Sequence, residues 1–288
     1  MKRLVLLLTI SLLLSAGCIS DTPQGAEGQQ LLLIEPSEPF PIYEGQGMYT
    51  WIIHGDTPIP PLNYSFGLVT IAPGNATPPH RLIGTSELVY VIKGTARIMC
   101  DNEEVTAGEG VLVLLPEGVL QSISTVGTTE LHYLSVNQPP FREESHIQGE
   151  DLTLLSMSTS AVPITIRDPN EHIEWDFNTG TLIYTLVNPQ LMQDMDIPID
   201  YSVAYTEILP GGSVVKNQLE GLSELLYVIE GEIVVSSPEY GVIRVPAGSA
   251  GYVQKGIVKE FFNQGNENAK VLSFVDPAWV LEKALIIE

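Results

Sequence analysis

The sequence predicts an all-β protein made of two β-sandwich or β-barrel domains in tandem. Three observations support this fold class. The chain has 288 residues, more than the roughly 250 at which a single core usually stops growing. The segment Ser86–Gly94 (SELVYVIKG) recurs as Ser223–Gly231 (SELLYVIEG), an offset of 137 residues. Both copies lie among short runs of Val, Ile, Leu and Tyr, separated by turns rich in Gly, Pro and Asn, as in β-sandwiches and barrels.

The composition supports a folded body and excludes one class of partner. Hydrophobic residues make up 44% of the chain and charged residues 17%, which is enough apolar material for packed cores. Lys and Arg total 13 against 35 Asp and Glu, a net charge of −22. Because such a surface repels phosphate groups, the chain is not expected to bind nucleic acid.

The first thirty residues predict export. Lys2 and Arg3 precede an apolar run that is short for a membrane span, which is typical of a signal peptide. The sequence Ser15-Ala16-Gly17-Cys18 resembles the lipobox of prokaryotic lipoproteins, although leucine is usual at the position of Ser15. The resemblance implies a signal peptide over residues 1–17, a lipidated Cys18 and a tether over 18–30. We therefore expect an extracytoplasmic body that meets the membrane through its lipid anchor only. A signal cleaved without lipidation, or left uncleaved, also places the body outside the cytoplasm.

The repeat sets the expected domain boundaries. We predict an N-terminal barrel over residues 31–142, a linker over 143–164 and a C-terminal barrel over 165–288. With Cys18 acylated, Cys100 is the only thiol left, and we expect it to be a small apolar core residue. We also expect the two barrels to bury an apolar face between them.

The spacing of Gly, Pro, His and Glu resembles the two motifs of the cupin superfamily. In the first repeat the motif positions are Gly74, His80, Leu82, Glu87, Gly94, Gly110, Pro116, Gly118, Gln121 and Thr125. In the second repeat they are Gly211, Asn217, Leu219, Glu224, Gly231, Gly248, Gln254, Gly256, Lys259 and Asn263. The chain therefore resembles a bicupin, a protein with two cupin barrels, on a lipoprotein signal. The resemblance implies that the all-β chain folds into two double-sheet jelly-roll barrels in tandem.

In metal-binding cupins three histidines and a glutamate hold a divalent ion inside the barrel. Here the resemblance implies that His80, Glu87 and Gln121 meet in the first barrel, where they could hold one Mn, Fe or Zn ion. Leu82 occupies the position of the second histidine. In the alternative, the three side chains satisfy one another by hydrogen bonds without an ion.

The second barrel offers Asn217, Glu224 and Lys259 at the corresponding positions. Because a lysine ammonium has no lone pair to donate, no metal is expected there. One hypothesis gives Lys259 an anionic ligand, and the other a buried ion pair with Glu224. A shift of one residue would replace Asn217 by Gln218 and Leu219 by Glu220.

The remaining histidines carry weaker expectations. His54, His146 and His172 fall in turns or connections, where exposure to solvent is the default. His132 lies in a strand and could point inward or outward.

The leading functional hypothesis is an exported, lipid-anchored bicupin that binds a small molecule in its N-terminal barrel, over a degenerate metal site. The alternative is a metal-dependent cupin enzyme, an oxygenase, hydrolase or isomerase, acting there on a small polar metabolite. A scaffold without pocket chemistry is the third class. Whether the chain is an enzyme and whether it forms homo-oligomers stay open, because cupins have many functions.

Overall fold

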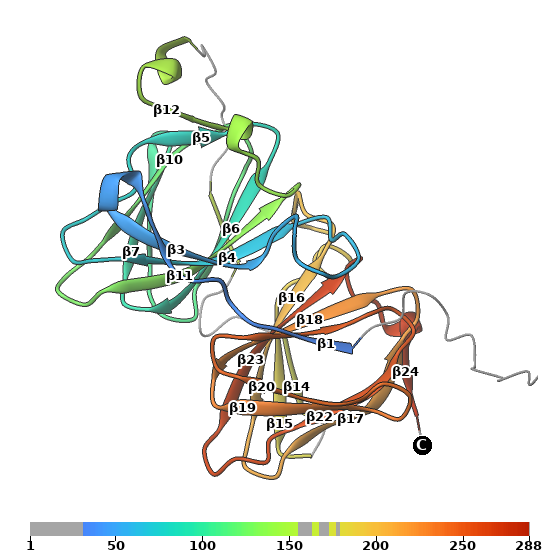
Figure 1. The fold of residues 1–288 in the computed structure, drawn as a ribbon. Helices are drawn as coiled ribbons and strands as arrows, with labels where there is room; N and C mark the ends of the chain where they lie inside the picture. The colour runs from blue at the N-terminus through green and yellow to red at the C-terminus, as the bar shows by residue number, and fades with distance from the viewer. Residues whose placement is uncertain (1–30, 155–162, 167–172, 177–178, 288) are drawn as a thin grey trace, which may run out of the picture.

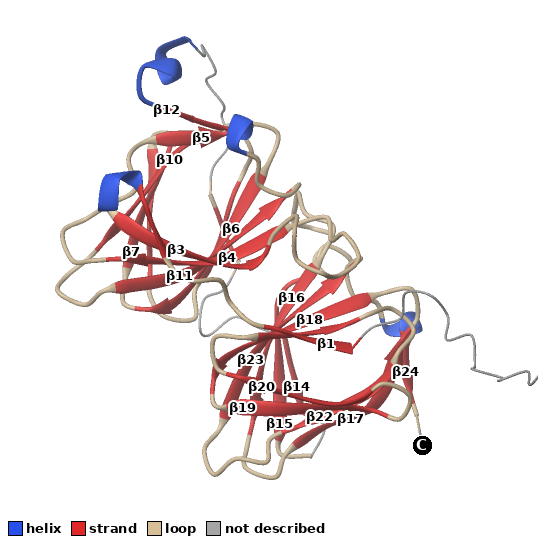
Figure 2. Cartoon of the chain, viewed as in Figure 1, coloured by secondary structure: helices blue, strands red, loops and turns tan. Residues whose placement is uncertain are grey.

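The computed structural model describes residues 31–154, 163–166, 173–176 and 179–287. It contains two β-barrels joined side by side, with only short 3-10 helices besides the strands (Figures 1 and 2). The all-β prediction of two tandem double-sheet barrels is confirmed. No helix in the described part of the chain is long and apolar enough to cross a membrane. The predicted signal peptide, Cys18 and tether lie outside the described residues.

Each barrel consists of a seven-stranded and a five-stranded antiparallel sheet. In the N-terminal barrel the larger sheet has the order β13 (Ile164–Thr165), β9 (Leu112–Leu115), β6 (Ser86–Lys93), β11 (Leu131–Gln138), β4 (Ser65–Ile71), β3 (Gly47–Ile53) and β2 (Phe40–Ile42). Its smaller sheet has the order β12 (His146–Gln148), β5 (His80–Leu82), β10 (Leu120–Thr125), β7 (Ala96–Cys100) and β8 (Glu103–Ala107).

The C-terminal barrel repeats this arrangement. Its larger sheet has the order β1 (Leu31–Ile34), β21 (Ala250–Val253), β18 (Ser223–Glu230), β23 (Ala269–Asp276), β16 (Ser202–Ile208), β15 (Thr181–Val187) and β14 (Ile173–Asp176). Its smaller sheet has the order β20 (Gly241–Pro246), β19 (Glu232–Ser237), β22 (Val258–Phe262), β17 (Ser213–Leu219) and β24 (Ala284–Ile286). The 3-10 helices are η1 (Tyr43–Gly45), η2 (Glu143–Ser145), η3 (Gly149–Leu154) and η4 (Leu281–Lys283).

The two larger sheets pack against each other and form one shared hydrophobic cluster. Alternate residues of a strand point to opposite faces, so Leu88 and Tyr90 of β6 enter the shared cluster while Val89 and Val91 enter the barrel interior. Across the interface the rings of Phe66 and Tyr227 pack edge to face, with centroids 5.2 Å apart. The expected apolar face between the barrels is therefore present.

The barrels also exchange strands, which corrects the predicted boundaries. β1, at the start of the predicted N-terminal barrel, pairs with β21 of the C-terminal barrel. In Figure 1 its blue ribbon accordingly lies with the orange and red strands. Conversely, β13 pairs with β9 of the N-terminal barrel, and β12 pairs with β5. The segment 143–164 was predicted to be a linker, yet it supplies one strand and part of another to the first barrel, because exposed sheet edges favour covering strands.

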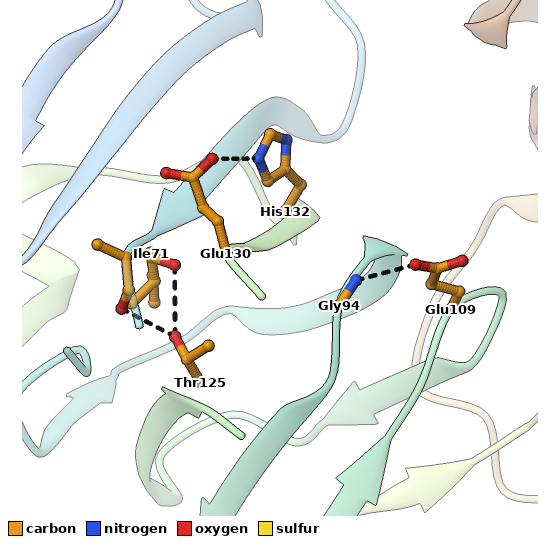
Figure 3. Close-up of polar contacts among 7 residues, drawn as sticks. Ile71, Gly94, Glu109, Thr125, Glu130 and His132 are labelled. Atoms are coloured by element: carbon orange, nitrogen blue, oxygen red, sulfur yellow. Dashed lines mark hydrogen bonds and ion pairs between the residues drawn. The ribbon is translucent and has the colours of Figure 1, made fainter. Parts of the chain in front are cut away.

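One repeated glycine shows why the motif spacing indicates the fold. Gly94 has a φ of +83°, and a Cβ there would lie 2.7 Å from the Glu130 carbonyl oxygen. Gly231 has a φ of +75°, and its Cβ would lie 3.0 Å from the Asn268 carbonyl oxygen. The Gly94 amide donates a hydrogen bond to the Glu109 carboxylate (Figure 3). Any larger residue would be strained at these corners, so the repeated glycine fixes the turn that follows β6 and β18.

Candidate functional site

The N-terminal barrel brings together the three side chains that the motifs predict. His80 comes from β5, Glu87 from β6 and Gln121 from β10, and all three are buried. The Gln121 Nε2 atom lies 3.1 Å from His80 Nε2 and donates to Glu87 Oε2 at 2.5 Å. The Ser135 hydroxyl donates to the other carboxylate oxygen at 2.5 Å. We refer to His80, Glu87, Gln121 and Ser135 as the N-barrel network.

The hydrogen bonds fix the direction of each donor. His80 Nδ1 lies 2.9 Å from the Pro78 carbonyl oxygen, which can only accept, so Nδ1 carries the proton and Nε2 accepts from Gln121. Burial lowers the pKa of His80, although the bond to Pro78 opposes this shift. Burial raises the pKa of Glu87, while the bonds from Ser135 and Gln121 work in the opposite direction. Both shifts favour the neutral forms, as expected for groups taken out of water.

His146 joins this site, although the sequence predicted an exposed histidine in a connection. It lies on β12 directly across from Leu82, the residue at the position of the second motif histidine. Its ring centroid is 4.9 Å from that of His80, and its Nε2 atom lies 3.3 Å from the Tyr43 hydroxyl. Burial, and to a lesser extent the neighbouring His80, lower the pKa of His146 to about 4. An imidazole from outside both motifs therefore lies beside the motif residues.

His80, Glu87 and Ser135 of the network form part of the wall of a cavity of about 1040 Å³. Aromatic residues, including Phe40, Tyr43, Tyr49, Trp51 and Phe141, make up much of the remaining wall. Three glutamates, Glu44, Glu87 and Glu143, also line it, and among the described lining residues there is no Lys or Arg. The cavity is thus large, aromatic and acidic.

The side chains present do not form a metal site in this arrangement. Gln121 points its amide nitrogen at both His80 and Glu87, so N–H groups occupy the lone pairs that an ion would need. Leu82 contributes an apolar side chain in place of an imidazole. In the described ranges no three His, Cys, Asp or Glu side chains gather closely enough to hold a metal. The contacts instead match the alternative in which the polar groups satisfy one another.

The C-terminal barrel brings together Asn217, Glu224 and Lys259. The Lys259 ammonium lies 2.9 Å from Glu224 Oε2 and donates to Asn217 Oδ1 at 2.6 Å. Only 2% of Lys259 is exposed. Asn217 and Leu219 line the adjoining cavity, whereas Gln218 donates to the Gly256 carbonyl, so the unshifted register holds.

The other sequence candidates lie outside these two sites. His132 pairs with Glu130 at 2.7 Å, and Figure 3 shows the two side chains facing each other. His54 is partly exposed and lies beside the exposed Asp56. Cys100 is fully buried, in agreement with its predicted role in the core, and burial raises its pKa to about 11. His172 and Cys18 lie outside the described residues.

Comparisons with known proteins agree with this architecture. The cupin domain family matches residues 67–137. No curated protein matches the sequence significantly.

Among solved structures, a variant of Bacillus subtilis oxalate decarboxylase superposes with a TM-score of 0.70 at 17% identity, covering 93% of this chain and 81% of that one. The formate complex of Lactobacillus farciminis oxalate decarboxylase gives a TM-score of 0.69 at 15% identity, with coverages of 91% and 90%. Another structure of the Bacillus subtilis enzyme concerns its Mn(II) centres. The family match shows a cupin domain over residues 67–137, and the structural matches, taken with the repeated motifs, show that the chain as a whole has the bicupin fold of two jelly-roll barrels.

Proposed function

We propose that the N-terminal barrel binds a small polar molecule that carries no net negative charge. The observation that carries this proposal is the cavity of about 1040 Å³, whose described wall includes His80, Ser135 and three glutamates and contains no Lys or Arg. Ligand sites commonly combine a mostly apolar cavity of this size with a few fixed polar groups.

The charge of the cavity separates this ligand from oxalate, which the names of the structural neighbours mention. A dianion would enter a cavity whose wall carries the carboxyl groups of Glu44 and Glu143, with burial favouring the neutral form of Glu87, on a chain of net charge −22. Like charges at short range raise the energy of such a complex, and among the described residues of the wall no Lys or Arg offsets the repulsion. A neutral or cationic molecule avoids this repulsion.

The aromatic wall favours a ligand with an apolar or cationic face. The rings of Tyr49 and Trp51 pack edge to face with their centroids 4.6 Å apart. The ring centroid of Trp51 lies 6.3 Å from that of Phe141. Rings of this kind attract organic cations as well as apolar surface. Glu87 and His146 provide acceptors for ligand N–H or O–H groups, and His80 remains engaged with Gln121 and Pro78.

Tryptophan fluorescence can test this proposal and assign the ligand to a barrel, because Trp51 lines the first cavity and Trp279 lines the second. We would titrate the full chain with choline, glucose and oxalate as cationic, neutral and anionic probes. We expect choline or glucose to bind, with a fluorescence change that Trp51→Phe removes and Trp279→Phe retains. Tight binding of oxalate with no response to the other two probes would contradict the proposal.

A metal-dependent cupin enzyme is the second candidate function, and one observation favours it. His146 places a second imidazole beside His80, in a fold shared with oxalate decarboxylases. This candidate requires the Gln121 amide to turn so that its oxygen, rather than its nitrogen, faces His80 and Glu87. Such a site would hold one Mn, Fe or Zn ion.

Metal analysis of the purified protein distinguishes the two candidates. We expect no stoichiometric Mn, Fe or Zn, either in the natural chain or in His80→Ala. The double variant Leu82→His/Gln121→His supplies two further imidazoles and serves as a positive control for metal uptake. One bound metal per natural chain, lost in His80→Ala, would replace the binding proposal with the enzyme.

We further propose that the protein is exported and anchored by a lipid on Cys18. The support is the cationic start, the apolar run and the small residues before Cys18. Fractionation of cells that express the full chain would test this. We expect the protein with the membranes and Cys18→Ser in the soluble extracytoplasmic fraction, and equal membrane association of both would contradict the proposal.

A further inference from the structure

The C-terminal barrel contains its own cavity, of about 280 Å³. One water molecule occupies about 30 Å³ in the liquid. With that volume for each non-hydrogen atom, the cavity holds a molecule of about nine non-hydrogen atoms. Lys259 and Glu224 are the only charged residues among its described lining, and they neutralise each other across 2.9 Å. The cavity therefore has no net charge to offer a ligand.

A comparison of equivalent positions shows which residues make the second cavity less polar than the first. Sheet register equates β12 with β24, since His146 pairs with Leu82 and Ala284 pairs with Leu219. The same offset of 138 residues relates four lining pairs in which a polar residue of the first barrel is replaced by an apolar one. These pairs are Asn137 and Val275, Glu143 and Leu281, His146 and Ala284, and Gln148 and Ile286.

One polar group in the apolar part of the cavity has no partner. Thr206 lies on β16, is fully buried and lines the cavity. Its hydroxyl makes no hydrogen bond to any described residue. An unpaired buried hydroxyl is costly, and buried polar groups are nearly always paired. Because the hydroxyl is closed off even from the cavity, the Thr206 side chain has to rotate before a ligand oxygen can supply the missing partner.

The mouth of the cavity is also apolar. Leu281 and Ile286 line it, and 67% and 63% of these residues is exposed. They belong to the segment that follows Pro277 and ends in β24. Exposed apolar residues around an apolar cavity are a common mark of a binding site.

We propose that the C-terminal barrel binds an uncharged, mostly apolar molecule of about nine non-hydrogen atoms, whose single oxygen hydrogen-bonds to Thr206. A medium-chain aliphatic alcohol has this chemistry. The buried pair of Lys259 and Glu224 closes one side of the site and disfavours charged ligands, because the two groups already neutralise each other and a third charge would be buried without a partner. This site is separate from the cavity of the N-terminal barrel.

Titration of the full chain with 1-octanol, without detergent, tests the proposal by calorimetry and by tryptophan fluorescence. Octanoate and octylammonium serve as anionic and cationic probes of the same length. We expect one octanol per chain and a fluorescence change that Trp279→Phe removes and Trp51→Phe retains. We expect weaker binding of both ions.

Two variants locate the ligand. Thr206→Val keeps the shape of the side chain and removes its hydroxyl, so the Kd for octanol should rise by about 2-fold to 12-fold. Ala204→Phe fills the cavity and should abolish binding, and Ala284→Phe at the mouth is the second choice where Ala204→Phe does not fold.

Three results would overturn the proposal. They are an unchanged Kd in Thr206→Val, a signal that follows Trp51 instead of Trp279, and tighter binding of octanoate than octanol. The last result would instead make Lys259 an anion site.

Discussion

The two barrels share a framework and differ in the side chain at its centre. Gln121 in the first barrel and Lys259 in the second occupy equivalent positions, and each contacts the glutamate of its own barrel. The Gln121 amide donates hydrogen bonds to His80 and Glu87, whose pKa shifts both favour the neutral form. The Lys259 ammonium instead neutralises the Glu224 carboxylate. The first barrel then keeps a polar cavity of about 1040 Å³ and the second an apolar one of about 280 Å³. One fold thus supports two different interiors. The repeated glycines fix the turns and the hydrophobic clusters fix the packing of the strands, whereas the residues that line each cavity differ between the barrels.

Removing the central charge should have the largest effect on stability. Lys259→Met leaves Glu224 buried without its partner, so the free energy of unfolding should fall by about 3–5 kcal/mol. Urea denaturation measures this loss. The double variant Lys259→Met/Glu224→Gln should recover most of it, since no buried charge then remains. A loss below about 1 kcal/mol in the single variant would show that water reaches the pair.

The equivalent change in the first barrel should cost less. Gln121→Leu removes the donor shared by His80 and Glu87 but leaves no uncompensated lysine, so we expect a loss of about 1–3 kcal/mol. The control is Ser124→Ala, on the exposed side of the same strand. If Gln121→Leu proved as costly as Lys259→Met, the proposed contrast between a neutral and an ionic centre would fail.

The first barrel should also respond to pH through His146. Its pKa in the folded protein is about 4, below the usual 6.5, so the unfolded chain takes up the proton first. Its contribution to stability is therefore present above pH 6.5 and is lost as the pH falls toward 4. We expect the melting temperature of His146→Asn to fall less than that of the natural chain between pH 7 and 4.5.

Glu87 should affect the pH dependence of stability in the opposite direction to His146 over the acidic range. Its pKa is raised in the folded protein, so its contribution is largest at low pH and is lost as the pH rises through the folded value. Replacing it by Gln removes this acid-side gain, and the melting temperature of Glu87→Gln should fall more steeply with acid than that of the natural chain. Parallel curves for all three proteins would mean that neither group has a different pKa in the folded and the unfolded chain.

The smallest effect is expected on the surface. Lys270 pairs with Glu230 at 2.8 Å, but both side chains are substantially exposed. Lys270→Met makes the same substitution as Lys259→Met in a solvated ion pair, and should change the free energy of unfolding by less than about 1 kcal/mol. Equal losses for the two methionine variants would show that burial is not what distinguishes the central pair.

The sequence predicted those parts of the fold and site that depend on local spacing. The doubled glycines and the Ser-Glu-Leu strand starts identified both barrels, and the same spacing brought His80, Glu87 and Gln121 together. His146 was not predicted, because its position depends on β12 adding to the edge of β5, a pairing between segments more than sixty residues apart. The recurrence of Pro139 as Pro277 at an offset of 138 could have revealed the match between β12 and β24.

The exchange of β1 and β13 was not predictable for a similar reason. Leu31–Ile34 is an apolar run that suits any sheet edge, and nothing in its residues identifies a partner more than two hundred residues away. Sequence order favours the nearer barrel. The actual pairing is decided by which edges remain open after both barrels have formed.

This exchange makes each barrel depend on the chain that encodes the other. A gene divided near residue 142 would give a first half that carries β1 without β21, and a second half that carries β12 and β13 without β5 and β9. Each product would present an open β edge in addition to half of the shared apolar interface, a combination that promotes aggregation. The two cavities therefore depend on one continuous chain, even though their linings differ.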